Sequence, residues 1–412
     1  MSRTIESTPS PDLARERILE QAEPGEPIEV SLADALGLIL AEPAVGDVDL
    51  PPFDRAAITG YAVRAAEASA GALLRVAGTR RSWRTGEGAI EAGEAIRVAA
   101  GDALPPGADA VVRPEDARPE PEPEAGPPRV IEILRGAGPA RGVSARGHLL
   151  GAGSVIAPAG TRLEAPMVGL LASQGCVHPV CHRRVRLAVM AIGDHLVGPS
   201  EAPVMHRERN AANAAIVALA LGAGAMPHDL QAVPESRFES AFERATAAPV
   251  IVVLGPAPRA VRRVFRSFGV DPVVRGLAMG PGGSARYGVI RDDSGRSAHH
   301  VFHLPIALVA ASAAFALLVR PLIARLQGWE DPGPRTLAAT WSGEHPATRD
   351  RLRVVPVALV EDDEGRRLAR PIPLRGVDDL PSFARAQGLA LLPARSGPWQ
   401  GGERVDVVRL GT

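Results

Sequence analysis

The chain has 412 residues and a formal net charge of −1, with 46% hydrophobic and 23% charged residues. This is ordinary globular composition, and about 100–200 residues per domain predicts two to four domains. The near-neutral charge and the 3% aromatic content argue against a nucleic-acid partner, because phosphate attraction and base stacking would both be weak. All 46 basic residues are arginine, which excludes chemistry that depends on lysine, such as Schiff bases and the P-loop lysine.

Cellular location is indicated by two weak signals. Two cysteines cannot form a disulfide framework, and residues 1–11 contain no apolar signal-peptide segment, so we expect a cytoplasmic protein. Residues 305–319 form an uncharged apolar run that is shorter than the roughly 20 residues needed to span a bilayer. Arg320 and Arg325 follow it, so we expect a buried helix and no membrane partner.

The first half of the chain predicts two short helices followed by a β-rich segment. Ser10 is a candidate N-cap for the first helix, and Ser31 for a second one that ends before Pro43. Residues 61–112 contain short β-like runs with frequent glycine. Residues 114–128 (PEDARPEPEPEAGPP) are acidic and rich in proline, which predicts an exposed polyproline-type loop without regular structure.

The second half predicts strands that alternate with helices. Helices are expected at residues 210–221 (with Asn210 as N-cap and Gly222 at C′), 234–245, 257–268 and 305–319, and strands at 185–192, 249–254, 273–274, 286–290 and 301–304. Such alternation predicts an α/β fold built on a doubly wound, mostly parallel sheet. After a Pro- and Gly-rich linker, the strand-like residues 351–360 and 404–410 predict a small β domain.

Three loops are expected beyond the carboxyl ends of the parallel strands, where ligands bind in this type of sheet. In residues 192–195 (IGDH), Asp194 suits Mg²⁺ or a hydroxyl group, or is simply a solvent-facing strand end. Residues 254–259 (LGPAPR) open a helix that suits an anion, although two prolines remove backbone donors. Residues 279–284 (MGPGGS) offer glycine amides for the same purpose, or form a plain turn.

Two groups of metal-capable residues carry weaker signals. Residues 176–182 (CVHPVCH) contain two cysteines and two histidines, Cys176, His178, Cys181 and His182. Structural zinc sites normally draw ligands from two separated segments, so a strand with a proline turn is the favoured interpretation. Residues 299–303 hold three histidines without an acidic partner in the pattern, which are more often incidental. No motif supports a nucleophilic triad.

Residues 50–64 (LPPFDRAAITGYAVR) closely resemble the PPFDNSAMDGYAVR signature of the molybdopterin molybdenumtransferases, the MoeA family, which is related to the E domain of gephyrin. Residues 101–112 (GDALPPGADAVV) and 157–163 (APAGTRL) resemble two further family motifs in the same order. The resemblance covers nearly the whole chain. It implies an elongated protomer that usually forms a homodimer, and an enzyme that hydrolyses adenylylated molybdopterin and inserts molybdate into its dithiolene with Mg²⁺.

The resemblance also implies four parts in the protomer. Residues 1–45 and 141–182 would form a discontinuous N-terminal linker and dimerisation domain. Residues 46–140 would form a small β-rich domain inserted into it. Residues 183–328 would form the α/β, molybdopterin-binding-like domain, and residues 335–412 the C-terminal β domain.

Site residues follow from the positions that match the family's motifs. The implied catalytic positions are Asp54, Thr59 and Asp194, and the implied metal positions are Asp194 and Glu208. The implied cofactor-binding positions lie in the matching loops: Gly193, Asn210, Gly255, Gly280, Pro281, Gly282 and Pro305. The implied cofactors are Mg²⁺ and molybdate, and the implied ligand is molybdopterin or its adenylylated form.

The sequence departs from the family pattern mainly at charged positions. In the signature, an Asn and the second Asp are replaced by Arg55 and Thr59. The family's STGDE loop keeps its Asp and has His195 in place of the Glu, and both lysines of its KPGKP loop are replaced, by Gly280 and Gly283. Replacing a buried acid that binds Mg²⁺ should cost several kcal/mol, about three or more orders of magnitude in rate.

Three hypotheses therefore stand side by side. The first is an active molybdenumtransferase. The second is a catalytically inactive paralogue that acts as a scaffold, as a cofactor-binding partner or as the partner of an active homologue. The third is an altered chemistry that uses Arg55, His148 and His195, which requires these side chains to converge within about 12 Å.

Overall fold

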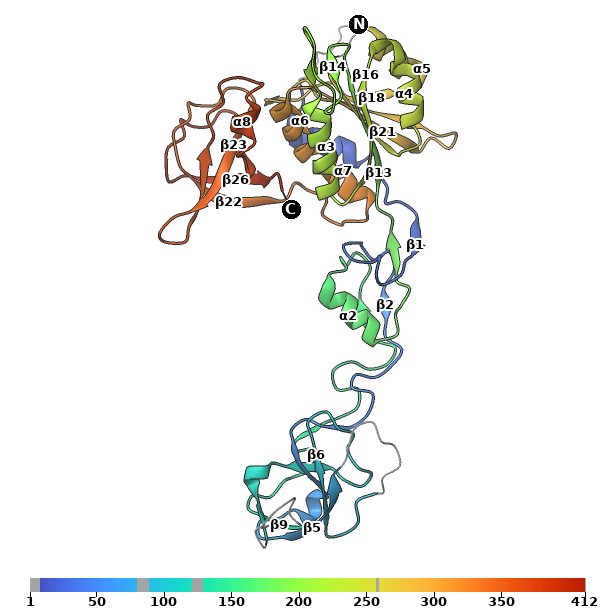
Figure 1. The fold of residues 1–412 in the computed structure, drawn as a ribbon, viewed down its shortest axis with the longest axis vertical. Helices are drawn as coiled ribbons and strands as arrows, with labels where there is room; N and C mark the ends of the chain where they lie inside the picture. Colours follow the sequence, from blue (N-terminus) through green and yellow to red (C-terminus); the bar gives the residue numbers. More distant parts are fainter. Residues whose placement is uncertain (1–7, 80–88, 121–128, 257–258, 412) are drawn as a thin grey trace.

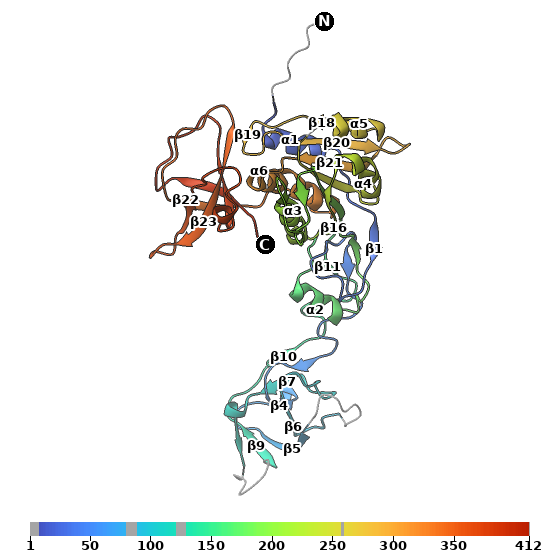
Figure 2. The same ribbon diagram turned by 45° about the horizontal axis from the view of Figure 1, so that its top comes forward.

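The computed structural model describes residues 8–79, 89–120, 129–256 and 259–411. These residues form an elongated molecule (Figure 1). A distal domain, which runs from β3 to β10, lies at one end, and a linking domain that contains α2 lies in the middle. The α/β domain and the C-terminal domain lie beside each other at the other end, an arrangement that Figure 2 shows from a second direction.

Of the two helices predicted near the N-terminus, the structure confirms the first and not the second. Helix α1 (Pro11–Leu19) begins as predicted, and the Ser10 hydroxyl accepts the amide of Leu13 at 3.2 Å. The predicted helix after Ser31 is wrong, because residues 32–37 form turns. The Ser31 hydroxyl donates to the Asp34 carboxylate at 2.7 Å, so its hydrogen bonds close a turn and do not cap a helix.

The linking domain is made where the chain passes outward and then returns. Its paired strands are β1 (Pro27–Glu29) with β12 (Val180–His182), and β2 (Ala44–Val45) with β11 (Val155–Ala157). Helix α2 (Ala165–Ser173) packs on them through Leu171. The buried side chains of Leu40, Leu163 and Cys181 complete this small core.

The distal domain contains a six-stranded sheet in the order β7-β4-β6-β5-β9-β8. These strands are β4 (Gly60–Val63), β5 (Leu73–Thr79), β6 (Glu94–Val98), β7 (Ala110–Val112), β8 (Ala117–Pro119) and β9 (Val130–Ile133). A Cβ atom on Gly60 would lie 2.1 Å from the Val112 carbonyl oxygen, so only glycine fits there. Strands β3 (Arg55–Ala56) and β10 (Val143–Ser144) pair where this domain joins the linking domain.

The acidic, proline-rich segment is partly structured. Residues 114–119 were expected in an irregular loop, and they form a 3₁₀ turn (η2, Pro114–Asp116) and strand β8. The nearly buried Asp116 explains the difference, because its carboxylate accepts a hydrogen bond from Arg141 at 2.9 Å and anchors the turn. The predicted loop at residues 121–128 lies outside the described residues.

The α/β domain is built on a six-stranded sheet in the order β16-β13-β17-β21-β20-β18. The first four strands are parallel, and β20 and β18 run antiparallel to their neighbours, so the expected α/β class with a mostly parallel sheet is confirmed. The strands are β13 (Arg186–Ile192), β16 (Met226–Val233), β17 (Val250–Leu254), β18 (Asp271–Val274), β20 (Arg286–Arg291) and β21 (Ser297–Leu304).

Helices cover both faces of this sheet, as a doubly wound fold requires. Helices α1, α3 (Ala211–Gly222), α6 (Leu308–Ala314) and α7 (Arg320–Leu326) pack on one face, and α4 (Phe238–Ala245) and α5 (Arg259–Ser267) pack on the other. A short turn, η3 (Glu235–Arg237), precedes α4. Helix α3 begins at its predicted cap but runs through Gly222, and the residue with positive φ after it is Gly224, at 76°.

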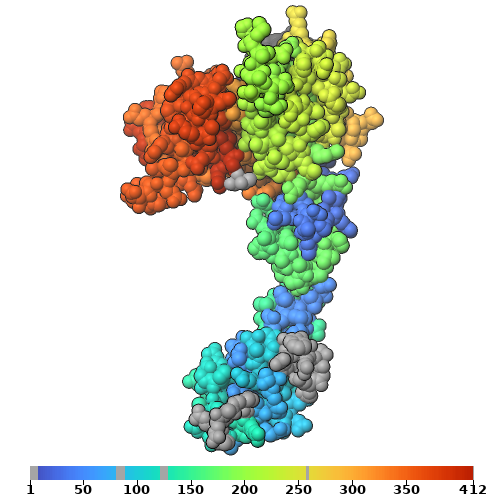
Figure 3. Space-filling view, in the orientation of Figure 1, coloured from blue at the N-terminus to red at the C-terminus, as the bar shows by residue number. Residues whose placement is uncertain are grey.

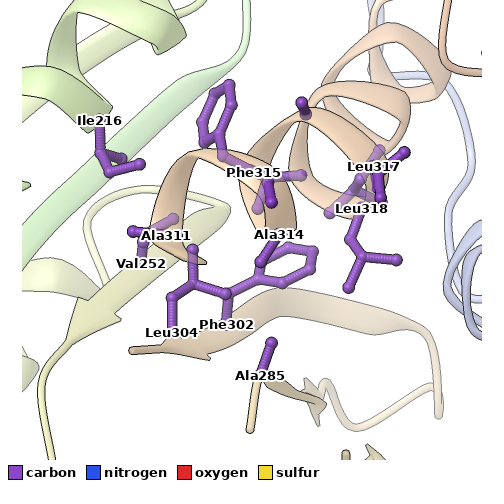
Figure 4. Close-up of a cluster of buried hydrophobic side chains, with 14 of the residues drawn as sticks. Ile216, Val252, Ala285, Phe302, Leu304, Ala311, Ala314, Phe315, Leu317 and Leu318 are labelled. Atoms are coloured by element: carbon purple, nitrogen blue, oxygen red, sulfur yellow. The ribbon is translucent and has the colours of Figure 1, made fainter. Parts of the chain in front are cut away.

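The apolar segment after β21 forms one long buried helical stretch that extends further than predicted. It consists of α6 (Leu308–Ala314), a π-helical turn (η4, Phe315–Val319) and α7 (Arg320–Leu326). Pro321 has no N–H to donate to Leu317, so the wider turn accommodates the proline without breaking the helix. Leu308–Leu326 is long and apolar enough to span a membrane by length and composition, but 78% of it is buried, against side chains such as Phe302 and Leu304 (Figure 4).

The C-terminal domain is a small closed sheet in the order β19-β23-β24-β22-β26-β25, with β23 also paired to β25. It contains β22 (Thr336–Trp341), β23 (Leu352–Glu361), β24 (Arg367–Pro371), β25 (Gly388–Leu392) and β26 (Arg404–Arg409), with the short helix α8 (Leu380–Phe383). Strand β19 (Met279–Gly280) belongs to the α/β domain in sequence, yet it pairs with the start of β23. This pairing joins the two domains.

Two buried histidines of strand β21 should make the fold sensitive to acid. Burial lowers the pKa of both His300 and His303 to about 4, from an unfolded value near 6.5. Between these values the unfolded chain binds more protons than the native one, so stability falls as the pH falls from about 6.5 towards 4. We expect each histidine to contribute a loss of about 2–3 kcal/mol between pH 7 and pH 4.5.

Urea unfolding at the two pH values measures this loss. The double variant His300→Gln/His303→Gln is the comparison, because all other titrating groups are common to both proteins. A variant whose stability depends on pH as strongly as the parent chain's would contradict the assignment.

Candidate functional site

Three predicted cofactor-binding residues lie together at the carboxyl edge of the sheet. Gly193, Gly255 and Pro305 directly follow the adjacent strands β13, β17 and β21. Gly255 has φ 128°, and a Cβ atom there would lie 2.7 Å from the Ile192 carbonyl oxygen. Its amide donates to the Leu304 carbonyl at 3.0 Å, so this donor is already used and is not free to bind a phosphate.

The two predicted metal positions have different partners. Asp194 is exposed, and its carboxylate accepts the amide of Glu235 at 3.0 Å, which ties the end of β13 to the turn before α4. Glu208 lies on β15 (Glu208–Arg209), which pairs with β14 (Leu196–Val197), and its carboxylate is 3.6 Å from His195 Nε2.

The donor set at this edge therefore does not fit a metal ion held by the protein alone. Within the described ranges, no group of three or more histidine, cysteine, aspartate or glutamate side chains is arranged to hold a metal. Mg²⁺ keeps several waters and is usually bound by one or two carboxylates together with substrate phosphates. Any Mg²⁺ used here would have to take most of its ligands from a bound substrate.

Asn210 is buried and caps α3. Its side-chain oxygen accepts the amide of Asn213 at 3.1 Å, which accounts for its position in structural terms. Asn213 was missed by the sequence reasoning. The residue is 2% exposed. The side-chain nitrogen, Nδ2, donates a hydrogen bond to the Asp229 carboxylate, and the side-chain oxygen has no hydrogen-bond partner among the described residues. Only its position in the first turn of a capped helix could have indicated it.

The loop at residues 280–282 borders a cleft between the α/β domain and the C-terminal domain. This domain cleft has a volume of about 670 Å³, and Pro281 and the start of α6 form one of its walls. Gly282 has φ 102°, and a Cβ atom there would lie 3.1 Å from the Ala310 carbonyl oxygen, so the loop packs tightly on α6. Close packing of the backbone therefore requires glycine at position 282.

Arg353 places a cation beside this loop. Strand pairing sets Arg353 opposite Gly280, and a Cβ atom on Gly280 would lie 3.8 Å from the Arg353 guanidinium. Arg353 also lines the domain cleft. The sequence reasoning missed it, although arginines at every second position, Arg349, Arg351 and Arg353, were a readable signal for one face of a strand.

The other wall of the domain cleft comes from the C-terminal domain, and the boundary between the two domains is visible in the space-filling view (Figure 3). Its polar side chains are Ser342, Glu344, His345 and Arg353. A guanidinium group binds phosphate in a fork, and an imidazole or a carboxylate is able to accept a proton from water. The cleft therefore combines anion binding with groups suited to general base chemistry.

Asp54 and Thr59 lie in the distal domain, at the opposite end of the protomer from the domain cleft (Figures 1 and 2). Both are exposed. The Asp54 carboxylate accepts the amide of Arg146 at 2.7 Å, and the Thr59 hydroxyl accepts the amide of Ala100 at 3.1 Å. A single protomer thus does not bring these two predicted catalytic residues to the sheet edge.

Two other predicted groups of residues, the set Arg55, His148 and His195 and the Cys/His segment, do not form a metal site among the described residues. Arg55 lies on β3, and His148 bonds the Ala145 carbonyl at 2.9 Å near the same corner, whereas His195 lies beside β14 in the α/β domain (Figure 1). These three do not converge in one protomer. In the Cys/His segment, His182 bonds the Gly25 carbonyl at 2.9 Å, and burial raises the pKa of the neighbouring Cys181 thiol to about 11.

The chain thus belongs to a class of elongated proteins with an α/β domain, a distal β domain and a small C-terminal barrel. Comparisons with known proteins identify this class. Residues 10–175 match the MoeA N-terminal region (domain I and II), and residues 339–410 match the MoeA C-terminal region (domain IV). The chain is 32% identical to molybdopterin molybdenumtransferase 1 of Mycobacterium tuberculosis, over 96% of this chain and 97% of that protein.

Two further relatives agree. Molybdopterin molybdenumtransferase of Bacillus subtilis is 27% identical over 98% of this chain and 94% of its own length. A solved molybdopterin biosynthesis MoeA protein from Pyrococcus horikoshii superimposes with a TM-score of 0.82 at 26% identity, over 98% of this chain and 100% of the other. The chain belongs to the MoeA family of molybdopterin molybdenumtransferases, which places it in molybdenum cofactor biosynthesis.

The close approach of two strand ends at Gly255 predicts a large effect of a single methyl group. Gly255→Ala adds a Cβ 2.7 Å from a backbone oxygen in a glycine-only conformation, so we expect it to lower the free energy of unfolding by about 3 kcal/mol or more. The control is Gly269→Ala, where φ is 69° but nothing lies within 4 Å, and we expect a loss of about 1 kcal/mol. Equal losses in urea titrations would show that contact with Ile192 is unimportant.

Proposed function

We propose that the domain cleft binds molybdopterin or its adenylylated form, and that the chain acts there as a molybdopterin molybdenumtransferase with molybdate as substrate. Membership of the family supports the activity, and the cleft of about 670 Å³ lies within the size range of small-molecule sites. The observation that carries the proposal is Arg353, which restores a cation to a loop whose own charged positions are glycine.

In this proposal, residues of the domain cleft bind the phosphate, shape the wall of the site and accept a proton. Arg353 binds a phosphate of the ligand through its guanidinium fork, and the backbone at Pro281 shapes the wall against which the ligand lies. His345 or Glu344 accepts the proton of the water that attacks the phosphoanhydride, and AMP leaves as that P–O bond breaks. Any Mg²⁺ used in the reaction would take most of its ligands from the substrate's phosphates, since no group of three or more metal-ligating side chains occurs within the described residues.

We further propose that the working form is a homodimer in which each domain cleft is completed by the distal domain of the second copy. Asp54 and Thr59 are exposed in the distal domain, and Asp54 directly precedes the strand pair β3–β10 where this domain joins the linking domain. Two such protomers, related by a twofold axis, place the distal end of each against the other's cleft, and a closed dimer gains two equivalent sites. This arrangement adds the Asp54 carboxylate to the Glu344 side chain that already lines each cleft.

Loss of the Arg353 fork should weaken ligand binding. We expect Arg353→Gln to raise the Kd for molybdopterin by about 10–100-fold, because charge-assisted hydrogen bonds contribute about 1.5–3 kcal/mol. Arg370→Gln is the control, because Arg370 is an exposed arginine of the same domain that does not line the cleft. Fluorescence titration measures the Kd, and equal affinities for the two variants would reject the cleft as the binding site.

Mixed dimers test the composite site. We expect Asp54→Ala and Arg353→Gln chains each to have little activity alone, and mixtures refolded together to recover about a quarter of the parent rate. Half of randomly formed dimers are mixed, and one of their two sites carries neither substitution. The measurement is AMP release from adenylylated molybdopterin with Mg²⁺ and molybdate, and a mixture no more active than its parts would contradict the shared site.

A second candidate function is a catalytically inactive paralogue that binds the cofactor as a scaffold or as the partner of an active homologue. Thr59 in place of an acid, the separate partners of Asp194 and Glu208, and the occupied amide of Gly255 favour it. The AMP-release assay decides between the two functions, with an ordinary family member as positive control. Tight molybdopterin binding without AMP release above the uncatalysed rate would select the inactive form.

A further inference from the structure

A second, larger cleft lies at the opposite edge of the α/β sheet. It has a volume of about 740 Å³ and is bordered by the linking domain, the end of α3, the end of α7 and the C-terminal domain. Asp331 is its one acidic lining residue in the part of the chain that the structure describes. Six lining residues are arginines: Arg162, Arg184, Arg320, Arg335, Arg367 and Arg409. We call it the arginine cleft.

Protein carboxylates neutralise only a small part of this charge, since Asp331 is the one acid among the described lining residues. Across the described ranges, Arg162 alone of the six has a carboxylate within 4 Å, that of Glu164 at 3.3 Å, and both side chains are largely exposed. Arg320 donates to the Arg409 carbonyl at 2.8 Å, and Arg184 donates to the Leu36 carbonyl at 3.0 Å. Carbonyl oxygens satisfy donors without removing charge, so the cleft keeps a concentrated positive potential in a protein whose net charge is −1.

The Trp329 ring contacts the guanidinium groups of two of these arginines. The Arg335 guanidinium lies 4.0 Å from the centre of the Trp329 ring, and the Arg162 guanidinium lies 5.5 Å from it. Cation–π contacts of this kind orient guanidinium groups and leave their N–H edges available to an anion. The indole ring is already in contact with arginine, so it is not a free platform for a nucleobase. These contacts favour recognition of phosphate groups.

The charged wall continues past the cleft itself. A neighbouring hollow of about 430 Å³ shares Arg367 and Arg409 with it. Burial also lowers the pKa of Arg320, which shows that this cation lies in a partly desolvated place where a bound counterion would be favourable. An anion that reaches several of these arginines needs more than one charged group.

We propose that the arginine cleft binds a small polyphosphate anion, of the kind found in inorganic tripolyphosphate and in the phosphate tail of a nucleotide. Arg335 and Arg162 approach it from the linker and the linking domain, and Arg367 and Arg409 approach it from the C-terminal barrel. The bound anion therefore bridges the C-terminal domain to the rest of the chain. This site is separate from the domain cleft, and it stands whether or not the molybdopterin proposal holds.

Calorimetric titration of the full-length chain with tripolyphosphate tests the site. We expect micromolar affinity that weakens as salt is raised, and a loss of at least tenfold in the double variant Arg367→Gln/Arg409→Gln. The matched control is Arg370→Gln/Arg404→Gln, which removes two exposed arginines from the same strands, β24 and β26, outside the cleft. We expect the control to bind like the parent chain.

Comparison of ligands decides which chemistry is recognised. We expect ATP to bind about as tightly as tripolyphosphate, and adenosine not to bind. Absence of tripolyphosphate binding at 1 mM (a concentration roughly three orders of magnitude above the expected Kd), equal loss in both double variants, or binding of adenosine as tight as that of ATP would each overturn the proposal. An acidic peptide that binds more tightly than tripolyphosphate and needs the same two arginines would also overturn it, in favour of a protein partner.

Two further measurements distinguish loss of the site from loss of the fold or of the domain cleft. Circular dichroism and the thermal midpoint of each variant without ligand establish that the variants fold. Molybdopterin affinity should be unchanged in Arg367→Gln/Arg409→Gln, because neither residue lines the domain cleft. A variant that loses both ligands together would show that the two clefts are not independent, and would contradict the separate site.

Discussion

The joint between the α/β domain and the C-terminal barrel is the contact on which both clefts depend. Strand β19 pairs with the first residues of β23, and the Leu352 amide donates to the Ala278 carbonyl at 3.0 Å. At the opposite edge, Arg320 of α7 donates to the carbonyls of Arg409, the last residue of β26, and of Leu410, which follows it. These hydrogen bonds act together with apolar packing, since Val354, Phe383 and Leu389 of the C-terminal domain are buried in the same cluster as the helices of the α/β domain. The domain cleft and the arginine cleft lie beside this joint.

The glycines that carry the family resemblance are held by packing. Gly60, Gly255 and Gly282 each sit where a Cβ atom would lie within about 3 Å of a backbone oxygen. Substitution at such positions disturbs the fold whatever the chemistry of the site. This explains how the chain keeps the glycine and proline framework of its family although charged positions such as Thr59 and Gly280 have changed. A motif made of framework residues thus predicts fold more strongly than activity.

Local signals predicted much of the fold. The caps of α1 and α3 and the apolar runs of β13 and β17 depend on neighbouring residues only, so they could be read from the sequence. The turn after Ser31 and the length of α7 could not, because Ser31 had the same signal as a helix cap and the π-helical turn that accommodates Pro321 has no sequence signature. The barrel's closing pair, β23 with β25, joins residues that are 31 to 39 positions apart in the chain, so local patterns could not indicate it either.

The site was predictable only in part, for the same reason. Strand ends that follow one another in the sheet placed Gly193, Gly255 and Pro305 at one edge, as the topology requires. The partners of Asp194 and Glu208 come from other elements, so the sequence could not show that the two acids face different neighbours. Arg353 was missed because its place beside Gly280 is created by a strand pair between two domains.

Arginine at the domain joints has a physical consequence for how the charge in this chain is used. Since lysine is absent, every cation carries a planar fork that is suited to oxyanions and aromatic faces. Arg353 and the six arginines of the arginine cleft lie where the barrel meets its neighbours, and an anion bound in either place contacts residues from more than one domain. An anion bound as proposed in either cleft would couple binding to domain arrangement, because an anion that bridges two domains adds its binding energy to the contact between them.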